Sequence, residues 1–99
     1  MDEDDRHGCL AMVYHRLGHQ AEAAREMEKF KTIVGDDEPY TAAGLYAQLG
    51  NKEEALRWLA EAEQRHDFDL LSMKVDWYLD PIRNEPQFKA IEARMKFPP

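Results

Sequence analysis

The chain repeats itself at a spacing of 32 residues. When residues 11–25 are aligned with residues 43–57, seven of the fifteen positions are identical. The identical residues are Ala, Tyr, Leu, Gly, Glu, Ala and Arg, starting at Ala11 in the first copy and at Ala43 in the second. A period of this length is typical of folds in which each repeat is one supersecondary unit that buries its apolar face against a neighbour.

Each copy is predicted to form two helices. In the first copy, Leu10, Tyr14 and Leu17 recur at the spacing of one apolar helical face. Gly18 is expected to end this helix and Gly35 the next, because glycine adopts a positive φ without a Cβ clash. Small residues are expected where the paired helices cross, at Ala11, Ala23, Ala43 and Ala55. The sequence therefore predicts an all-α fold.

These residues resemble a known helical repeat. The motif is His7-x2-Leu10-Ala11-x2-Tyr14 followed by Ala23-x3-Met27, with Pro39-x2-Ala42-Ala43-x2-Tyr46 followed by Ala55-x3-Leu59 in the second copy. It is similar to the tetratricopeptide (TPR) repeat. The resemblance implies one TPR-like domain over residues 1–99, a right-handed α-hairpin solenoid of repeats 5–34 and 37–66 with a degenerate third segment, 67–96, as its cap.

The C-terminal part carries a second resemblance. The stretches Met73-Lys74-Val75-Asp76, Leu79-Asp80-Pro81-Ile82-Arg83 and Glu85-Pro86-Gln87-Phe88-Lys89-Ala90-Ile91 resemble the closing segment of TPR regions in bacterial multidomain signalling proteins. In those proteins the region is attached to transcriptional regulators, adenylate cyclases or protein kinases. From the apolar pattern, we expect a third helix with Leu70, Leu71 and Val75 buried and a last helix whose apolar face holds Phe88, Ile91 and Met95.

The TPR resemblance implies a function without chemistry. The expected module binds a peptide or a helix of a protein partner in a concave groove formed by the first helix of each pair. The groove residues implied by the resemblance are Met12, His15, Arg16, Tyr40, Gly44, Ala47 and Gln48. The alternative function is a C-terminal regulatory or sensing region of a larger bacterial transcriptional regulator or other signalling protein.

Charge and composition exclude several other classes. The formal net charge of −7 disfavours nucleic-acid and membrane-surface partners, which both need a basic surface. No apolar run approaches the roughly 20 residues of a membrane-spanning helix, and the N-terminus has no secretory pattern. A single cysteine, Cys9, suits a cytoplasmic protein. Because two repeats form a small core, a homodimer through Leu10, Met12 and Val13 is a further expectation.

Catalytic and metal sites are weakly indicated. The cluster of His7, Cys9, His15 and His19 invites a zinc hypothesis, but Gly18 interrupts the helix between the last two histidines. We interpret the cluster as exposed helical histidines and an ordinary cysteine, with metal-dependent hydrolysis around His15 and His19 as the enzyme alternative. No phosphate-binding loop or nucleophile motif is present. The sequence thus predicts no enzyme activity, no metal and no cofactor.

Overall fold

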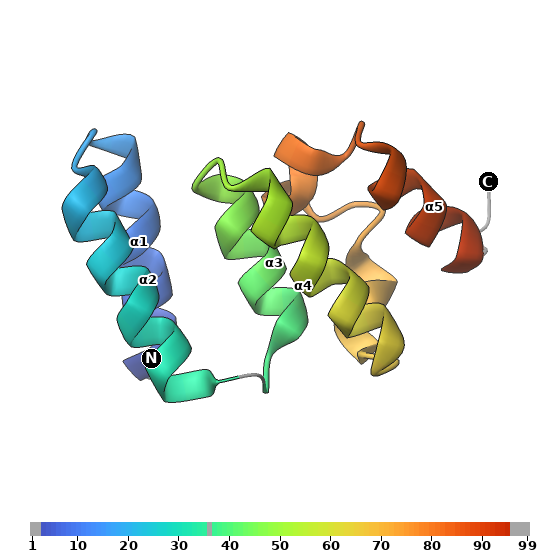
Figure 1. The fold of residues 1–99 in the computed structure, drawn as a ribbon, viewed down its shortest axis with the longest axis horizontal. Coiled ribbons are helices and arrows are strands. Elements are labelled where there is room, and N and C mark those ends of the chain that lie inside the picture. Colours follow the sequence, from blue (N-terminus) through green and yellow to red (C-terminus); the bar gives the residue numbers. More distant parts are fainter. Residues whose placement is uncertain (1–2, 36, 96–99) are drawn as a thin grey trace. The chain divides into compact units, whose positions relative to one another are not determined.

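The computed structural model describes residues 3–35 and 37–95. In these residues, helices are the only regular secondary structure, and turns connect them (Figure 1). The elements are α1 (Glu3–Arg16), α2 (Gln20–Val34), α3 (Pro39–Gln48), α4 (Lys52–Gln64), the 3₁₀ helices η1 (Phe68–Ser72) and η2 (Trp77–Ile82), and α5 (Pro86–Met95). The all-α prediction is confirmed. The last residue of the predicted third segment lies outside the described residues. In the described part, no helix has the length and apolar character needed to cross a bilayer.

Residues 1–38 and 39–99 form two compact units. In the first unit, α1 packs against α2; in the second, α3 packs against α4, η2 packs on both of these helices, and α5 packs on α4. The second unit therefore contains both the second predicted repeat and the third segment. The stacking of hairpins that a solenoid requires stays a prediction, as do the predicted repeat boundaries.

The two hairpin turns have the same backbone geometry, 32 residues apart. The His19 amide donates to the Tyr14 carbonyl at 2.8 Å, and the Asn51 amide donates to the Tyr46 carbonyl at 2.9 Å. The preceding glycines have φ values of 82° and 81°, in the left-handed region that favours glycine. At the start of α4, the Asn51 side chain also accepts the Glu54 amide at 3.2 Å and so caps the helix N-terminus. The internal repeat is thus a repeat of structure as well as of sequence.

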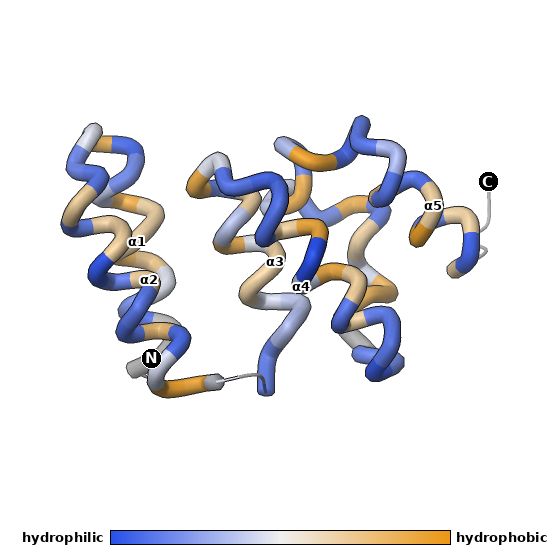
Figure 2. Tube along the Cα trace, in the orientation of Figure 1, coloured by the Kyte–Doolittle hydropathy of each residue, from blue (hydrophilic) through white to orange (hydrophobic). Residues whose placement is uncertain are grey.

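The core of each hairpin is built from the amphipathic pattern of its helices. Figure 2 shows polar and apolar residues interspersed along each helix. The four repeat alanines, Ala11, Ala23, Ala43 and Ala55, are at most 3% exposed. Larger side chains complete the interior, with Phe30 buried in the first unit and Leu59 in the second. Small residues at these positions allow the backbones of the paired helices to approach closely.

Ala55→Leu is expected to lower the free energy of unfolding by about 1–3 kcal/mol, because the larger side chain overpacks a fully buried position. Urea denaturation followed by circular dichroism measures this change. The matched control is Ala60→Leu, the same substitution at an exposed position of α4, which is expected to change stability by less than about 0.5 kcal/mol. Equal effects of the two substitutions would contradict a close crossing at Ala55.

The third segment differs from its prediction. A regular helix was expected to bury Leu70, Leu71 and Val75, but the chain forms the short helix η1 and then a turn. Only Leu70 is buried; Leu71 is 61% exposed and Val75 is 83% exposed, so their predicted burial was wrong. Leu71 lies in η1, whose tighter winding changes the face on which a side chain lies, and Val75 lies in the turn that follows η1. The predicted last helix is confirmed as α5, with Phe88 and Ile91 buried.

Candidate functional site

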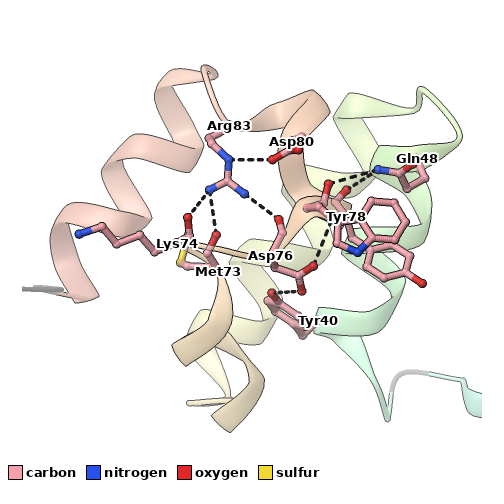
Figure 3. A network of polar contacts seen from close by, with 9 residues as sticks. Tyr40, Gln48, Met73, Lys74, Asp76, Tyr78, Asp80 and Arg83 are labelled. Carbon is pink, nitrogen blue, oxygen red and sulfur yellow. Dashed lines mark hydrogen bonds and ion pairs between the residues drawn. The ribbon is translucent and has the colours of Figure 1, made fainter.

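The predicted binding residues of the second hairpin lie on α3, and the chain's own C-terminal segment covers them (Figure 3). Tyr40, Gly44 and Ala47 are buried, and Gln48 is half-buried. A Cβ atom at Gly44 would lie 3.2 Å from Cβ of Tyr78, so the bare backbone of the glycine admits this residue. The α3 residues are therefore occupied within the second unit, and the partner-binding role predicted for them stays a prediction.

Residues 76–78, which we call the covering segment, contact α3 through main-chain carbonyls and through one carboxylate. Oδ2 of Asp76 accepts the Tyr40 hydroxyl at 2.7 Å, and Oδ1 accepts the Tyr78 amide at 3.0 Å, which caps η2. From α3, Nε2 of Gln48 donates to the carbonyl oxygens of Tyr78 at 3.1 Å and of Trp77 at 3.5 Å. Helix α3 thus binds Asp76 and the first residues of the 3₁₀ helix η2 through main-chain carbonyls and an acidic side chain.

Arg83 fixes the same segment from its other side. Its guanidinium donates to the carbonyl oxygens of Met73 at 3.0 Å, Lys74 at 2.8 Å and Asp76 at 2.6 Å (Figure 3). A further hydrogen bond joins Nε to Oδ1 of Asp80 at 3.1 Å. Several donors in a fixed fork are what a guanidinium provides and a lysine does not. Arg83 therefore holds the turn between η1 and η2 in one conformation.

Sequence reasoning assigned no structural role to Asp76 or Arg83, although both belong to the tail that carries the second resemblance. A local signal for Asp76 exists in the sequence. An aspartate can accept the backbone amide two residues further on and start a turn, and Asp80-Pro81 marks a further turn. Nothing local points to the three carbonyl acceptors of Arg83, because the fold alone brings them together.

The predicted binding residues of the first hairpin form what we call the α1 face: Met12, His15 and Arg16. Met12 and His15 are half-buried and Arg16 is exposed. Nδ1 of His15 lies 3.3 Å from Oε1 of Gln20. Within the described residues, no hydrogen bond or ion pair engages the Arg16 guanidinium. The α1 face therefore presents an available cation beside a flexible thioether side chain.

His7 is buried, which contradicts its interpretation as an exposed histidine. Its Nδ1 lies 2.5 Å from Oε2 of Glu26, and this hydrogen bond joins α1 to α2. The hydrogen bond from His7 lowers the pKa of Glu26 below the ordinary value of 4.5; burial opposes the shift and Lys29 adds to it. The pair is a cross-link inside the hairpin. Sequence periodicity could not reveal it, because the partners lie 19 residues apart.

We expect the first hairpin to lose stability in acid through Glu26. Because its pKa in the folded state lies below 4.5, the ionised carboxylate stabilises the fold above that pH, and this contribution is lost as the pH falls through the folded-state pKa. Urea denaturation at several pH values between about 3 and 7 measures the change. Glu26→Gln should destabilise the chain at neutral pH and much less at the acidic end. A stability difference that is independent of pH would contradict the assignment.

The remaining histidines do not assemble a metal site in the described part of the chain. Nδ1 of His19 lies 2.9 Å from Oε2 of Glu22, and its ring stacks on Tyr14 with the centroids 6.1 Å apart. No group of three or more His, Cys, Asp or Glu side chains within the described residues could hold a metal ion. The absence of an enzyme activity stays a prediction.

Several large apolar side chains are exposed. Val13 on α1 is 50% exposed and Leu17, directly after α1, is 63% exposed, and Leu10 and Met12 on α1 are half-buried. Trp77, in the covering segment, is 50% exposed and stacks on Tyr78 with the ring centroids 4.1 Å apart. The homodimer predicted through Leu10, Met12 and Val13 stays a prediction.

The second unit also contains a pocket of about 330 Å³ that sequence reasoning did not indicate. It lies between the end of α4, η1 and α5. Its lining combines an ion pair with apolar side chains and includes Glu63, His66, Asp67, Leu70, Leu71, Arg94 and Met95. Oε1 of Glu63 accepts from Arg94 at 2.7 Å, and the hydrogen bond from Arg94 lowers the pKa of Glu63. The ion pair ties α5 to α4.

Comparison of the chain with protein-family models, with curated proteins and with solved structures found no match.

Proposed function

We propose that this chain is a non-catalytic, TPR-like scaffold that binds a peptide or a helix of a protein partner. The observation that carries the proposal is the pair of helical hairpins with equivalent turns and buried alanines at equivalent positions. Repeated hairpins of this kind present rows of equivalent side chains, which suits recognition of an elongated partner. Because a scaffold of one fold can serve many partners, the surface residues decide which partner is bound.

The α1 face is the part of the predicted binding surface that we propose for the partner. The equivalent positions on α3 are filled by residues 76–78, whereas Arg16 on α1 is exposed. Tyr40 is unsuitable for testing the proposal, since its hydroxyl holds Asp76. Variants of Met12 and Arg16 are better probes, because neither side chain is fully buried.

Site-specific photo-crosslinking in cells of the source organism tests the proposal. A photoreactive amino acid at position 12 or 16 is expected to give adducts with a discrete partner protein, identified by mass spectrometry. The control carries the same amino acid at Glu28, an exposed position of α2. The proposal fails if positions 12 and 16 give no adduct, or only the adducts seen at position 28. An adduct of twice the mass of the chain identifies the homodimer instead.

A second candidate function is a C-terminal regulatory region of a larger bacterial signalling protein. It is favoured by the tail, in which Asp76, Asp80 and Arg83 act together to fold the covering segment onto α3. A folded cap of this kind suits the end of a repeat array, because a terminal repeat needs a polar outer face to stay soluble. The continuous reading frame of the gene tests this candidate. Fusion to a DNA-binding, cyclase or kinase domain supports it, and a free-standing chain contradicts it.

A further inference from the structure

We infer that the pocket in the second unit binds a small amphipathic cation, a molecule that carries an ammonium group on an apolar body. The pocket has a volume of about 330 Å³, at the lower end of the range of about 300–1,000 Å³ that small-molecule sites span. Its described lining comes from the end of α4, from η1 and from the last turn of α5, all within one compact unit. This surface is separate from the α1 face, so the inference does not depend on the proposed function.

The apolar part of the lining suits the body of such a molecule. Leu70 is buried, Met95 is half-buried and Leu71 is 61% exposed. The exposed leucine leaves apolar surface in contact with water inside a recess, and an apolar ligand that displaces this water gains free energy. The exposure of Leu71, which the apolar pattern did not predict, is therefore favourable for binding.

The charged part of the lining favours a cation over an anion. Arg94 donates two hydrogen bonds to Glu63, from Nε to Oε2 at 2.8 Å and from Nη2 to Oε1 at 2.7 Å, so these two charges balance each other. Asp67 adds a second carboxylate, which gives the lining a net negative charge when His66 is uncharged. Helix α4 also ends here, and the C-terminal end of a helix carries a partial negative charge. An ammonium group therefore complements this pocket better than a carboxylate does.

The turn that ends α4 provides a second indication. His66 has a φ of 54° and is the only non-glycine residue with a positive φ in the described part of the chain, where the other such positions are Gly18, Gly35 and Gly50. A glycine would form this turn without a Cβ clash, so a histidine here costs conformational free energy. Costs of this kind are typical of functional sites. The His66 side chain lines the pocket, and an imidazole with one proton has a nitrogen that accepts a hydrogen bond from an ammonium group.

Three matched compounds test the inference: phenethylamine, phenethyl alcohol and hydrocinnamate, which share a phenyl ring on a short chain and differ in the charge of the head group. Each is titrated into the intact ¹⁵N-labelled chain while the backbone amide signals are monitored by NMR. Phenethylamine is expected to give saturable shifts at Asp67, Leu70 and Leu71 and to bind about fivefold more tightly than the alcohol, with hydrocinnamate the weakest. The inference is overturned if phenethylamine does not saturate, if hydrocinnamate binds as tightly, or if the shifts concentrate on α1 and α2.

Asp67→Asn is expected to weaken binding of phenethylamine by about fivefold and to leave binding of the alcohol within about twofold. The control is Glu53→Gln, which removes the same formal charge from an exposed position at the other end of α4. Equal effects of the two substitutions would overturn the inference, because they would reflect a general attraction of cations to an acidic chain. The comparison of the three compounds needs no variant, so a substitution that disturbs the turn does not affect it.

Two further variants test the rest of the lining. Leu71→Ser is expected to weaken binding of all three compounds by about threefold, whereas Val75→Ser, at an 83% exposed position outside the lining, should leave it within about twofold. His66→Gly retains the turn, because glycine adopts the same φ, and should weaken phenethylamine by about threefold without lowering the melting temperature. An unchanged affinity for phenethylamine in Leu71→Ser or in His66→Gly would overturn the assignment of the ligand to this pocket.

Discussion

Phe88→Ala is expected to lower the free energy of unfolding of the second unit by about 3–5 kcal/mol, the largest effect of a single substitution that we predict. The ring is fully buried in α5, so its removal forfeits apolar burial and leaves a cavity. It also removes the ring over which the Arg83 guanidinium lies, 5.4 Å from its centroid. One side chain therefore supports both the last helix and the arginine that fixes the covering segment.

Urea denaturation followed by circular dichroism measures the effect, and amide hydrogen exchange locates it. Exchange in α5 and η2 is expected to accelerate more than exchange in α1 and α2, which belong to the other unit. Gln87→Ala, at the neighbouring exposed position, is the matched control and should change stability by less than about 0.5 kcal/mol. Phe88→Leu should fall between the two. A loss below about 1 kcal/mol for Phe88→Ala would mean that the ring is not a core residue.

Arg83→Met is expected to destabilise the second unit by about 3 kcal/mol, because three carbonyl oxygens and a carboxylate lose a charged donor at once. Methionine keeps most of the aliphatic volume, so the loss reports on hydrogen bonding and charge. Arg83→Lys should recover only part of the stability, since an ammonium group cannot reproduce the planar fork. Thermal and urea unfolding of the three proteins measure the series.

Arg57→Met is the control for this series. Arg57 is an exposed arginine of α4 that pairs with Glu54 three residues away, an arrangement that contributes little to stability. Its replacement should cost less than about 1 kcal/mol. If Arg83→Lys were as stable as the wild type, the several hydrogen bonds of the guanidinium to the turn would not matter for stability. A single positive charge would then explain the role of Arg83.

Local features of the fold could be predicted from the sequence. Gly18 and Gly50 end helices because their φ values suit glycine, and Asn51 caps α4 because its side chain reaches a nearby amide. Such features depend on residues within a few positions of one another. The repeat alanines are also buried as expected, because the 32-residue correspondence marks them as equivalent.

Non-local features could not be predicted. The spacing places Tyr40, Gly44 and Gln48 on one surface of α3, but the segment that covers them lies about 30 residues further along the chain. The same holds for His7, whose partner Glu26 is on the next helix. The predicted burial of Leu71 and Val75 was wrong for another reason. An apolar pattern does not distinguish an α-helix from a short 3₁₀ helix followed by a turn.

The matching turns after α1 and α3 make the two hairpins interchangeable building blocks. Residues 14–23 and 46–55 connect helices through the same set of backbone hydrogen bonds, so either loop can be grafted into the other hairpin without altering the path of the chain. Chimeras of this kind preserve the junctions while exchanging the side chains that a hairpin displays.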